Sequence, residues 1–397
     1  MPWELCFRPA AARFGLREYD PPALGPGQVR AATILAAPKH GTELRFWEGS
    51  VFRGRRWDAR LRLFLDAEVQ ASAPPEAVAV GNMAVAEVTE AAPDVRGLAV
   101  GDRVYGYMPV REVQTLDAAR LRPLGRLCPE DAVCLDPAHV ALVAVRDGGV
   151  RVGDWACVFG LGAIGLMVVQ AARASGATRV FAVDPLAPRR RRALALGAEE
   201  AFDPGAGDVA LAIKGATGLD GVDVALEVAG AAASLGQAIR CLRQCGTVVA
   251  VGWGHGDGRG LYLGEEFHVN RPTIVGSQAV WDNPDRDHPR WQEARARATC
   301  VTLFETGRLT SRGVLDPVVS LQEAPEVLDA VLHNPGAVEK VGVRFAAAPV
   351  PGSAGAPEGS GAASALPPRP RSGGRRAGGP SAAPRRPRRG GGEPPQR

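Results

Sequence analysis

Between residues 151 and 280, short apolar runs alternate with segments whose apolar positions recur at helical spacing. Short apolar runs bounded by turn residues indicate buried strands, and the longer periodic segments indicate helices. The predicted strands are Trp155–Val158, Val180–Asp184, Glu200–Phe202, Val222–Val228, Thr247–Gly252 and Thr273–Gly276. The predicted helices between them are Leu166–Ala174, Arg190–Leu196 and Ala231–Leu242. This alternation predicts an α/β fold, a doubly wound parallel sheet with helices on both faces.

The first 150 residues follow a different pattern, in which short strands are separated by turns rich in glycine and proline. The predicted strands are Val29–Leu35, Val85–Thr89 and Arg103–Tyr107. Such a pattern predicts an irregular, mainly β domain. Residues 281–345 hold a helical segment, Trp291–Gly307, and a strand-like end, Val338–Phe345. That is too little for a separate domain, so we expect this segment to return to the first one.

The composition changes after Phe345. Residues 346–397 consist almost entirely of Pro, Gly, Ala, Ser and Arg, and such a segment cannot bury enough apolar surface to fold, so we expect a disordered tail. The tail has a net charge of +7 and the whole chain +4, which leaves residues 1–345 at −3. A folded region of that charge gives no electrostatic reason to expect nucleic acid as a partner. Contact of the arginine-rich run 385–390 with an anionic surface stays open as an alternative.

Other features of the sequence limit the class of protein to which the chain can belong. No apolar run approaches the length needed to span a membrane. Residues 1–10 lack the basic start and apolar stretch of a secretory signal. The seven cysteines are scattered and form neither a disulfide framework nor a four-cysteine zinc cluster. We therefore expect a cytoplasmic protein with reduced thiols.

The strongest chemical signal lies where the first predicted strand of the parallel sheet meets its helix. The run Phe159–Gly165 has the pattern G-x-G-x-x-G, and a second strand ends in an acid about twenty residues later, which is the context of a dinucleotide site. Gly160 permits the tight turn, Gly162 lets the backbone approach a pyrophosphate, and Gly165 lets the helix pack closely on the strand. The candidate cofactor-binding residues of this region are Gly160, Leu161, Gly162, Ala163, Ile164, Gly165, Val228 and Gly252.

Asp184 bears on the choice between NAD and NADP. A carboxylate at the end of the second strand accepts hydrogen bonds from the ribose hydroxyls of NAD and repels a 2′-phosphate. The four arginines at positions 189–192 favour the opposite choice, because they offer a place for that phosphate. Arg189 is also a candidate to lie over the adenine. We expect NAD, with NADP as the alternative.

The layout resembles the medium-chain dehydrogenase/reductase superfamily. The residues that carry the resemblance are Gly101–Val104, the loop Gly160–Gly165, Gly197–Ala198 and Gly246–Val248. The resemblance implies a Rossmann NAD-binding domain (151–280) inserted in a GroES-like catalytic domain (1–150, with 281–345 returning to it). It also implies an oxidoreductase that acts on the CH–OH group of a small-molecule alcohol, or on its carbonyl product. A homodimer or homotetramer is implied as well.

The chain departs from the zinc-dependent members of this superfamily at their metal ligands. The resemblance places His40 at the first ligand, a cysteine in those members. It places Asn82 and Met83 at the second and third, and Asp136 at a further acidic position. A catalytic zinc is usually bound by about three nitrogen, thiolate or carboxylate ligands from the protein. Only His40 and Asp136 qualify, with His139 nearby, so we expect no catalytic zinc and a likeness to zinc-free members.

Without zinc, a side chain must take the proton of the substrate hydroxyl. The resemblance points to His40, and Lys39 is the alternative, because only one of two adjacent residues on an extended strand faces the pocket. It also implies that Thr42 relays a proton between substrate and cofactor ribose. Asp136 is a candidate to orient His40 or to bind a substrate hydroxyl, and Asn82 to donate to the substrate oxygen.

Three functions remain open on the sequence. The first is an NAD-dependent dehydrogenase of a polyol, sugar or similar secondary alcohol, which Asp184 favours. The second is a zinc-free quinone or enone reductase that uses NADPH, which the lost ligands permit. The third is a non-catalytic nucleotide-binding protein on the same scaffold.

Overall fold

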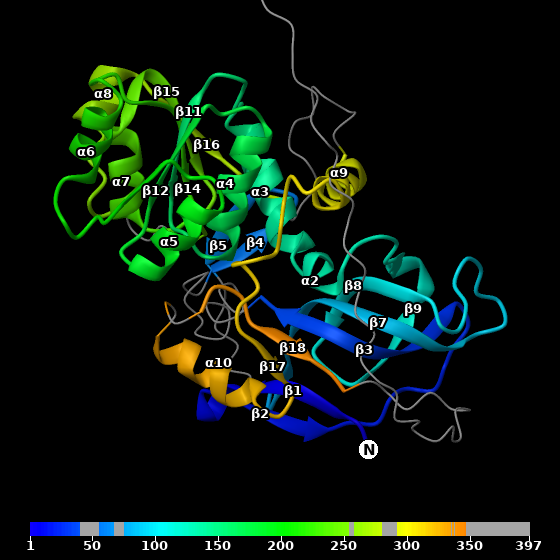
Figure 1. Ribbon diagram of the computed structural model, residues 1–397. Helices are drawn as coiled ribbons and strands as arrows, with labels where there is room; N and C mark the ends of the chain where they lie inside the picture. Colours follow the sequence, from blue (N-terminus) through cyan, green and yellow to red (C-terminus); the bar gives the residue numbers. More distant parts are fainter. Residues whose placement is uncertain are drawn as a thin grey trace, which may run out of the picture. The chain divides into compact units, whose positions relative to one another are not determined.

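The apolar runs of residues 151–280 form a six-stranded parallel sheet (Figure 1). Its strands are β11 (Trp155–Phe159), β12 (Arg179–Val183), β13 (Glu200–Phe202), β14 (Val222–Glu227), β15 (Leu242–Ala250) and β16 (Thr273–Gly276). They lie in the order β13-β12-β11-β14-β15-β16. This is the strand order of a dinucleotide-binding sheet, in which the order reverses beside the first strand. The predicted α/β class is confirmed.

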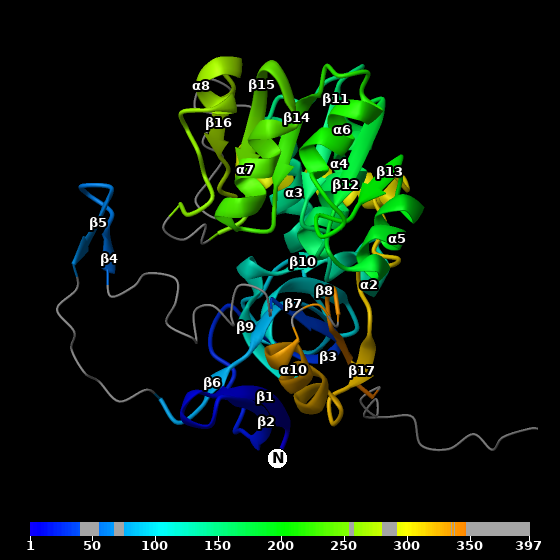
Figure 2. The same ribbon diagram turned by 90° about the vertical axis from the view of Figure 1, so that its left-hand side faces the viewer.

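Helices cover both faces of this sheet (Figures 1 and 2). They are α4 (Ala163–Ala174), α5 (Ala187–Ala195), α6 (Val209–Ala216), α7 (Ala232–Arg240) and α8 (Glu266–Asn270). Alternate residues of β11 point to opposite faces. Ala156 and Val158 belong to the core that includes α4, and Cys157 and Phe159 to the core that includes α6 and α7. Protein covers both faces of the sheet and keeps water away, which is why the strands are continuous apolar runs.

The structure corrects the predicted ends of several elements. Helix α4 begins at Ala163 rather than Leu166, and α5 at Ala187 rather than Arg190. Leu242 was predicted to end a helix, but it begins β15, because it is fully buried and pairs with Val222 of the neighbouring strand. The short helix α6 was not predicted.

The first 150 residues form most of a mainly antiparallel seven-stranded sheet. Its strands are β3 (Gln28–Pro38), β7 (Gly81–Ala91), β8 (Arg103–Pro109), β9 (Val113–Asp117), β10 (Arg122–Pro123), β17 (Val318–Ser320) and β18 (Gly342–Arg344). The last strand, β18, pairs antiparallel with β3, Val343 opposite Ala36. The end of the described chain therefore completes the sheet that the first residues begin.

Smaller elements complete this region. The remaining strands are β1 (Trp3–Arg8), β2 (Arg13–Glu18), β4 (Arg55–Asp58), β5 (Leu63–Asp66) and β6 (Val78–Ala79). The remaining helices are α2 (Pro129–Ala132), α3 (Leu135–Asp147), α9 (Glu293–Glu305), α10 (Ala324–His333) and two short 3₁₀ turns, Pro9–Ala11 and Ala118–Arg120. Helix α3 carries a long buried face and packs on α4, so its start is held firmly where the candidate site lies.

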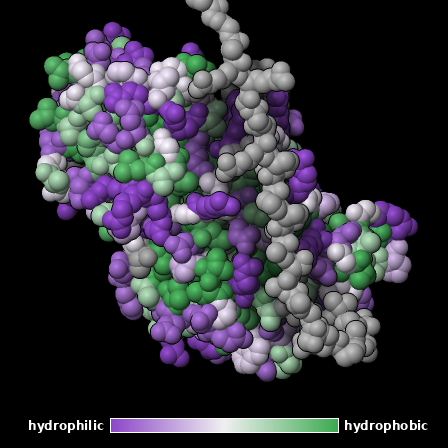
Figure 3. All heavy atoms as spheres, viewed as in Figure 1, coloured by the Kyte–Doolittle hydropathy of each residue, from purple (hydrophilic) through white to green (hydrophobic). Residues whose placement is uncertain are grey.

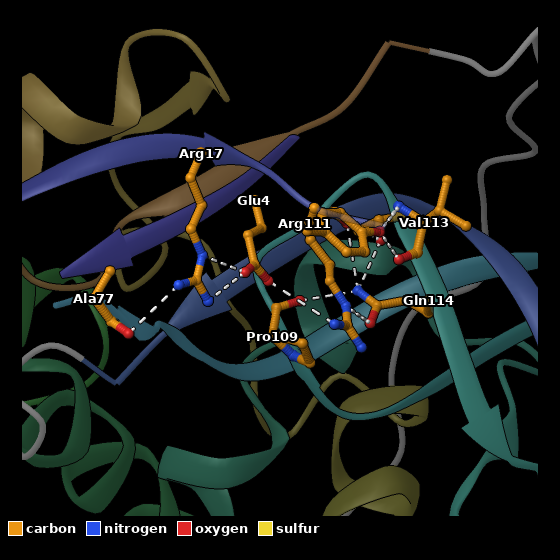
Figure 4. Close-up of polar contacts among 9 residues, drawn as sticks. Glu4, Arg17, Ala77, Pro109, Arg111, Val113 and Gln114 are labelled. Atoms are coloured by element: carbon orange, nitrogen blue, oxygen red, sulfur yellow. Dashed lines mark hydrogen bonds and ion pairs between the residues drawn. The ribbon is translucent and has the colours of Figure 1, made fainter. Parts of the chain in front are cut away.

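A buried carboxylate joins the hairpin β1–β2 to the larger sheet (Figure 4). Glu4 is 3% exposed, lies 2.7 Å from Arg17 and 3.9 Å from Arg111, and is thereby compensated in charge. Arg111 in turn donates to Gln114, whose amide donates to Thr33. The network is satisfied within the protein and holds the hairpin in place.

The computed structural model describes residues 1–39, 55–66, 75–253, 258–279, 292–334, 336 and 338–346. The predicted tail lies almost entirely outside these ranges. Within them, no helix is both long and apolar enough to cross a bilayer. On the face of the molecule seen in Figure 3, hydrophilic and hydrophobic residues are interspersed.

Candidate functional site

Two glycines of the glycine-rich loop are required by the packing of the protein itself, and a third is not. Gly160 has φ +88°, and a Cβ there would lie 2.7 Å from the Ala229 nitrogen. A Cβ on Gly165 would lie 1.8 Å from the Gly160 carbonyl oxygen, which forbids any larger residue. At Gly162, no described atom lies within 4 Å of the Cβ position. The space above Gly162 is therefore open, as a site for a close-lying ligand requires.

The same loop supplies the donors that an anion needs. Gly162 is the N-cap of α4, and no side chain caps this end of the helix. The first helical bond runs from the Leu166 N–H to the Gly162 carbonyl, so the N–H groups of Ala163, Ile164 and Gly165 precede the helical ladder. Such groups, together with the helix dipole, bind phosphate. The loop therefore fits the pyrophosphate of a dinucleotide.

Asp184 follows β12 directly and is only 3% exposed. Its Oδ2 accepts a hydrogen bond from the Leu161 N–H at 2.8 Å, and its Oδ1 accepts one from the Leu186 N–H at 2.8 Å. The Leu161 side chain is buried, so this residue holds Asp184 in place rather than presenting its own side chain to a ligand. Asp184 is thus fixed beside the loop.

Three of the four arginines beside Asp184 are paired with carboxylates of the chain. Arg189 lies 3.8 Å from Asp184 and 3.7 Å from Glu339. Arg192 lies 2.6 Å from Glu339 and also contacts Asp316. Arg190 lies 3.0 Å from Asp203, while Arg191 is exposed. The alternative in which these arginines hold a 2′-phosphate therefore competes with existing ion pairs.

The two remaining candidates for cofactor contact, Val228 and Gly252, lie just after β14 and β15. The Val228 N–H donates to the Phe159 carbonyl, and the side chain is half-buried. A Cβ on Gly252 would lie 2.2 Å from the Gly230 nitrogen. Gly252 is therefore required for backbone packing between two strand ends, a role that the sequence did not reveal.

A second cluster forms around Asp136, in the first turn of α3. Its Oδ2 lies 3.0 Å from Lys39 Nζ and accepts from Asn82 Nδ2 at 3.1 Å. Its Oδ1 accepts from the Tyr107 hydroxyl at 3.0 Å. Burial alone would raise the pKa of Asp136, but the charges of Lys39 and Lys340 hold it below its usual value. The carboxylate is therefore ionised and fully occupied by partners from this chain.

Tyr107 extends this cluster towards α9. Its hydroxyl accepts a hydrogen bond from Arg297 at 2.9 Å, and Arg297 pairs with Glu293 at 2.6 Å. Burial of the hydroxyl end and the nearby charge of Asp136 raise the pKa of Tyr107 to about 12, so it stays protonated and donates to Asp136. Sequence reasoning missed Tyr107 as a site residue, although it lies in a predicted strand. It missed Arg297 because no motif surrounds that residue.

Two further basic residues lie near the cluster. Lys340 is 3% exposed and donates to the Pro38 carbonyl at 3.3 Å, next to Lys39. His139 lies one helical turn after Asp136 and is buried, and both burial and the charge of Arg297 lower its pKa. His139 is therefore a neutral imidazole near pH 7.

The donor set at the metal positions of the resembling family does not fit a catalytic zinc. Asn82 offers an amide and Met83 a thioether, and the one carboxylate, Asp136, already has Lys39 as its counter-ion. Among the described residues, no group of three His, Cys, Asp or Glu side chains has a metal-binding arrangement. His40 and Thr42, the predicted acid/base and relay, lie outside the described residues. Their roles stay predictions.

Comparison with known proteins identifies the family. The model of the zinc-binding dehydrogenase family matches residues 163–294. D-guloside 3-dehydrogenase of Escherichia coli is 37% identical over 338 residues, which cover 83% of this chain and 96% of that protein. The chain belongs to the medium-chain dehydrogenase/reductase superfamily. Its members bind NAD or NADP, and the chain is an oxidoreductase of the alcohol-dehydrogenase type.

Solved structures of this superfamily share the fold. The (2R,3R)-butanediol dehydrogenase of Bacillus subtilis superposes with a TM-score of 0.68 at 24% identity, over 87% of this chain and 99% of that one. A zinc-binding dehydrogenase of Sinorhizobium meliloti, solved with NADP, superposes with a TM-score of 0.66 at 23% identity and the same coverage. At these identities the likeness establishes the superfamily fold and no more.

Proposed function

We propose that this medium-chain dehydrogenase oxidises a secondary hydroxyl of a sugar or polyol with NAD and does so without a catalytic zinc. The observation that carries the proposal is the occupied carboxylate of Asp136. Lys39, Asn82 and Tyr107 surround it at 3.0 to 3.1 Å. The resemblance to zinc-dependent members aligns Asn82 and Asp136 with ligand positions of their metal. In this protein the ammonium group of Lys39 would supply the positive charge that zinc supplies in the zinc-dependent members.

The substrate class rests on two supports. The related Escherichia coli protein is named for the oxidation of a guloside at position 3, which is a ring hydroxyl of a sugar derivative. The cluster around Asp136 also presents several polar side chains, as recognition of a molecule with several hydroxyl groups requires.

The choice of NAD over NADP rests on Asp184 and its surroundings. The carboxylate is fixed beside the loop by Leu161 and Leu186, where it accepts from ribose hydroxyls and repels a 2′-phosphate. Of the arginines that would offset that repulsion, Arg189 and Arg192 are paired with carboxylates of the chain.

In this mechanism the loop and Asp184 would hold and orient the dinucleotide, which would supply the hydride acceptor. The substrate hydroxyl must lose its proton in the same reaction. We assign that proton to His40, with Thr42 as the relay to the cofactor ribose. Lys39, held by Asp136, stabilises the developing negative charge on the substrate oxygen. Strand β3 ends at Pro38, so Lys39 lies beyond the strand.

Turnover of a panel of sugars, polyols and enones with NAD and with NADP tests the proposal, with metal analysis of the same sample. We expect NADH formation with a sugar or polyol and far less than one zinc per chain. NADPH-linked reduction of an enone would favour a zinc-free reductase instead, and binding of NAD without any turnover would favour a non-catalytic protein. Stoichiometric zinc that is lost in His40→Ala would overturn the zinc-free mechanism.

The acid/base assignment has its own test. His40→Ala should lower turnover by about 10²- to 10⁴-fold while the affinity for NAD stays within a few-fold, because the residue acts at the reacting end of the cofactor. The rise of the wild-type rate with pH near neutrality should disappear in this variant. Near-normal turnover with an unchanged pH profile would remove His40 from the mechanism. Lys39→Met would then be examined in the same way.

A further inference from the structure

The segment that returns from the end of the chain lies against helix α5, which begins just after Asp184. Arg189 Nη2 donates to the Val338 carbonyl at 3.1 Å. A Cβ on Gly336 would lie 2.4 Å from the Leu186 side chain, so the contact is tight. This segment brings Glu339, a residue about 150 positions away in the sequence, to the start of α5.

Glu339 is a buried carboxylate shared by two arginines. Its side chain is 2% exposed, and its Oε1 lies 2.6 Å from Arg192 and 3.7 Å from Arg189. Burial raises the pKa of Glu339, although both arginines act to lower it. Oε2 is buried, and no hydrogen-bond partner reaches it within the described part of the chain. Burial of a carboxylate with one unsatisfied oxygen lowers the stability of the fold, which points to a role of Glu339 beyond packing.

Arg189 lies between this carboxylate and the one expected to meet the ribose. Its Nη1 is 3.8 Å from Asp184 Oδ2 while its Nε faces Glu339. A 2′-phosphate would enter next to Asp184, within reach of this guanidinium. A bound phosphate would compete for the N–H donors of Arg189 with Asp184, with the Val338 carbonyl and with Glu339. The returning segment supplies Glu339 as one of these competitors.

We propose that Glu339 is a specificity-determining residue of the dinucleotide site, which holds Arg189 and Arg192 so that they do not bind a 2′-phosphate. The inference rests on the proposed use of NAD. It adds to Asp184, which repels the phosphate directly, a second residue that acts through the arginines. The preference for NAD is then shared between the cofactor-binding domain and the returning segment.

The test is the binding of NAD and NADP to the full-length protein, measured by calorimetry without substrate. Glu339→Gln keeps the shape of the side chain and removes its charge, so NADP should bind about 10- to 150-fold more tightly, the contribution of one charge-assisted hydrogen bond. Binding of NAD should stay within a few-fold. The gain should shrink with added salt and vanish in Glu339→Gln/Arg189→Ala, because Arg189 provides the new contact.

Matched variants separate this role from a structural one. Asp316 is the second carboxylate that contacts Arg192, and its side chain is half-exposed. Asp316→Asn should leave the affinities for NAD and NADP unchanged. Glu339→Asp keeps the charge and should keep the preference for NAD. If Glu339→Gln unfolds, the charge-balanced Glu339→Gln/Arg192→Gln leaves Arg189 released and should show the same gain for NADP.

The outcomes distinguish this inference from the proposed function. A wild-type protein that binds NADP more tightly than NAD would overturn the proposed cofactor and this inference with it. A wild-type preference for NAD that stays unchanged in folded Glu339→Gln would overturn the role of Glu339 alone. An equal gain for NADP in Asp316→Asn would also overturn it, since any lost carboxylate near α5 would then suffice.

Discussion

Gly162→Ala separates cofactor binding from folding, because no protein atom lies within 4 Å of the new Cβ among the described residues. The backbone at Gly162 has φ −70° and ψ −171°, which alanine adopts without strain. The free energy of unfolding should therefore change by less than about 1 kcal/mol. The Cβ would instead occupy the space in which a pyrophosphate approaches the start of α4. Loss of one charge-assisted hydrogen bond, about 1.5–3 kcal/mol, weakens binding by about 10- to 150-fold.

Two other glycines serve as controls. Gly165→Ala would place its Cβ 1.8 Å from the Gly160 carbonyl oxygen, so the loop must shift and the free energy of unfolding should fall by about 2 kcal/mol or more. Gly215 is exposed in α6, and its Cβ position is also open. Gly215→Ala should therefore raise the free energy of unfolding by about 0.5–1 kcal/mol and leave the affinity for NADH unchanged.

The assay combines denaturant unfolding with titration of NADH fluorescence for each variant. We expect Gly162→Ala to unfold like the wild type and to bind NADH weakly. Wild-type affinity in this variant would show that the pyrophosphate does not lie over Gly162, and the assignment of the loop would be refuted. A large loss of stability would instead show that the space is filled by the protein.

Three further predictions concern ionisable groups. Asp184→Ser should bring the dissociation constants of NAD and NADP close together or invert them, and an unchanged ratio in calorimetric titrations would exclude Asp184 as the discriminating group. Lys39→Met should lower the free energy of unfolding by about 3 kcal/mol, because it leaves the buried charge of Asp136 without its counter-ion. The double variant Lys39→Met/Asp136→Asn should recover part of that free energy. No recovery would contradict the ion pair. The folded protein holds the pKa of His139 below its ordinary value, so the unfolded chain binds more protons below about pH 6.5, and stability should fall there. Urea titrations of the wild type and His139→Gln should diverge only below that pH, and parallel curves throughout would refute the shift.

The sequence determined the parallel sheet and the cofactor loop of this protein. Apolar runs of the right length specify buried strands, and the loop glycines act on a turn of a few neighbouring residues. Asp184 belongs to the same unit, because it directly follows the next strand. The fold class was therefore predicted correctly, and the errors fell at element ends such as Leu242, where burial and pairing override local helix periodicity.

Only the tertiary structure decided which distant residues meet. The register of β3, β7 and β8 sets Pro38 opposite Asn82 and Asn82 opposite Met108, so Lys39 and Tyr107 are delivered to the same place by strand pairing. The returning segment likewise brings Glu339 to the arginines of α5. Local periodicity carries no information about such pairings, because each strand could satisfy its own pattern in several registers. The packing of the whole chain selects one of them, and with it the partners of every charge in the site.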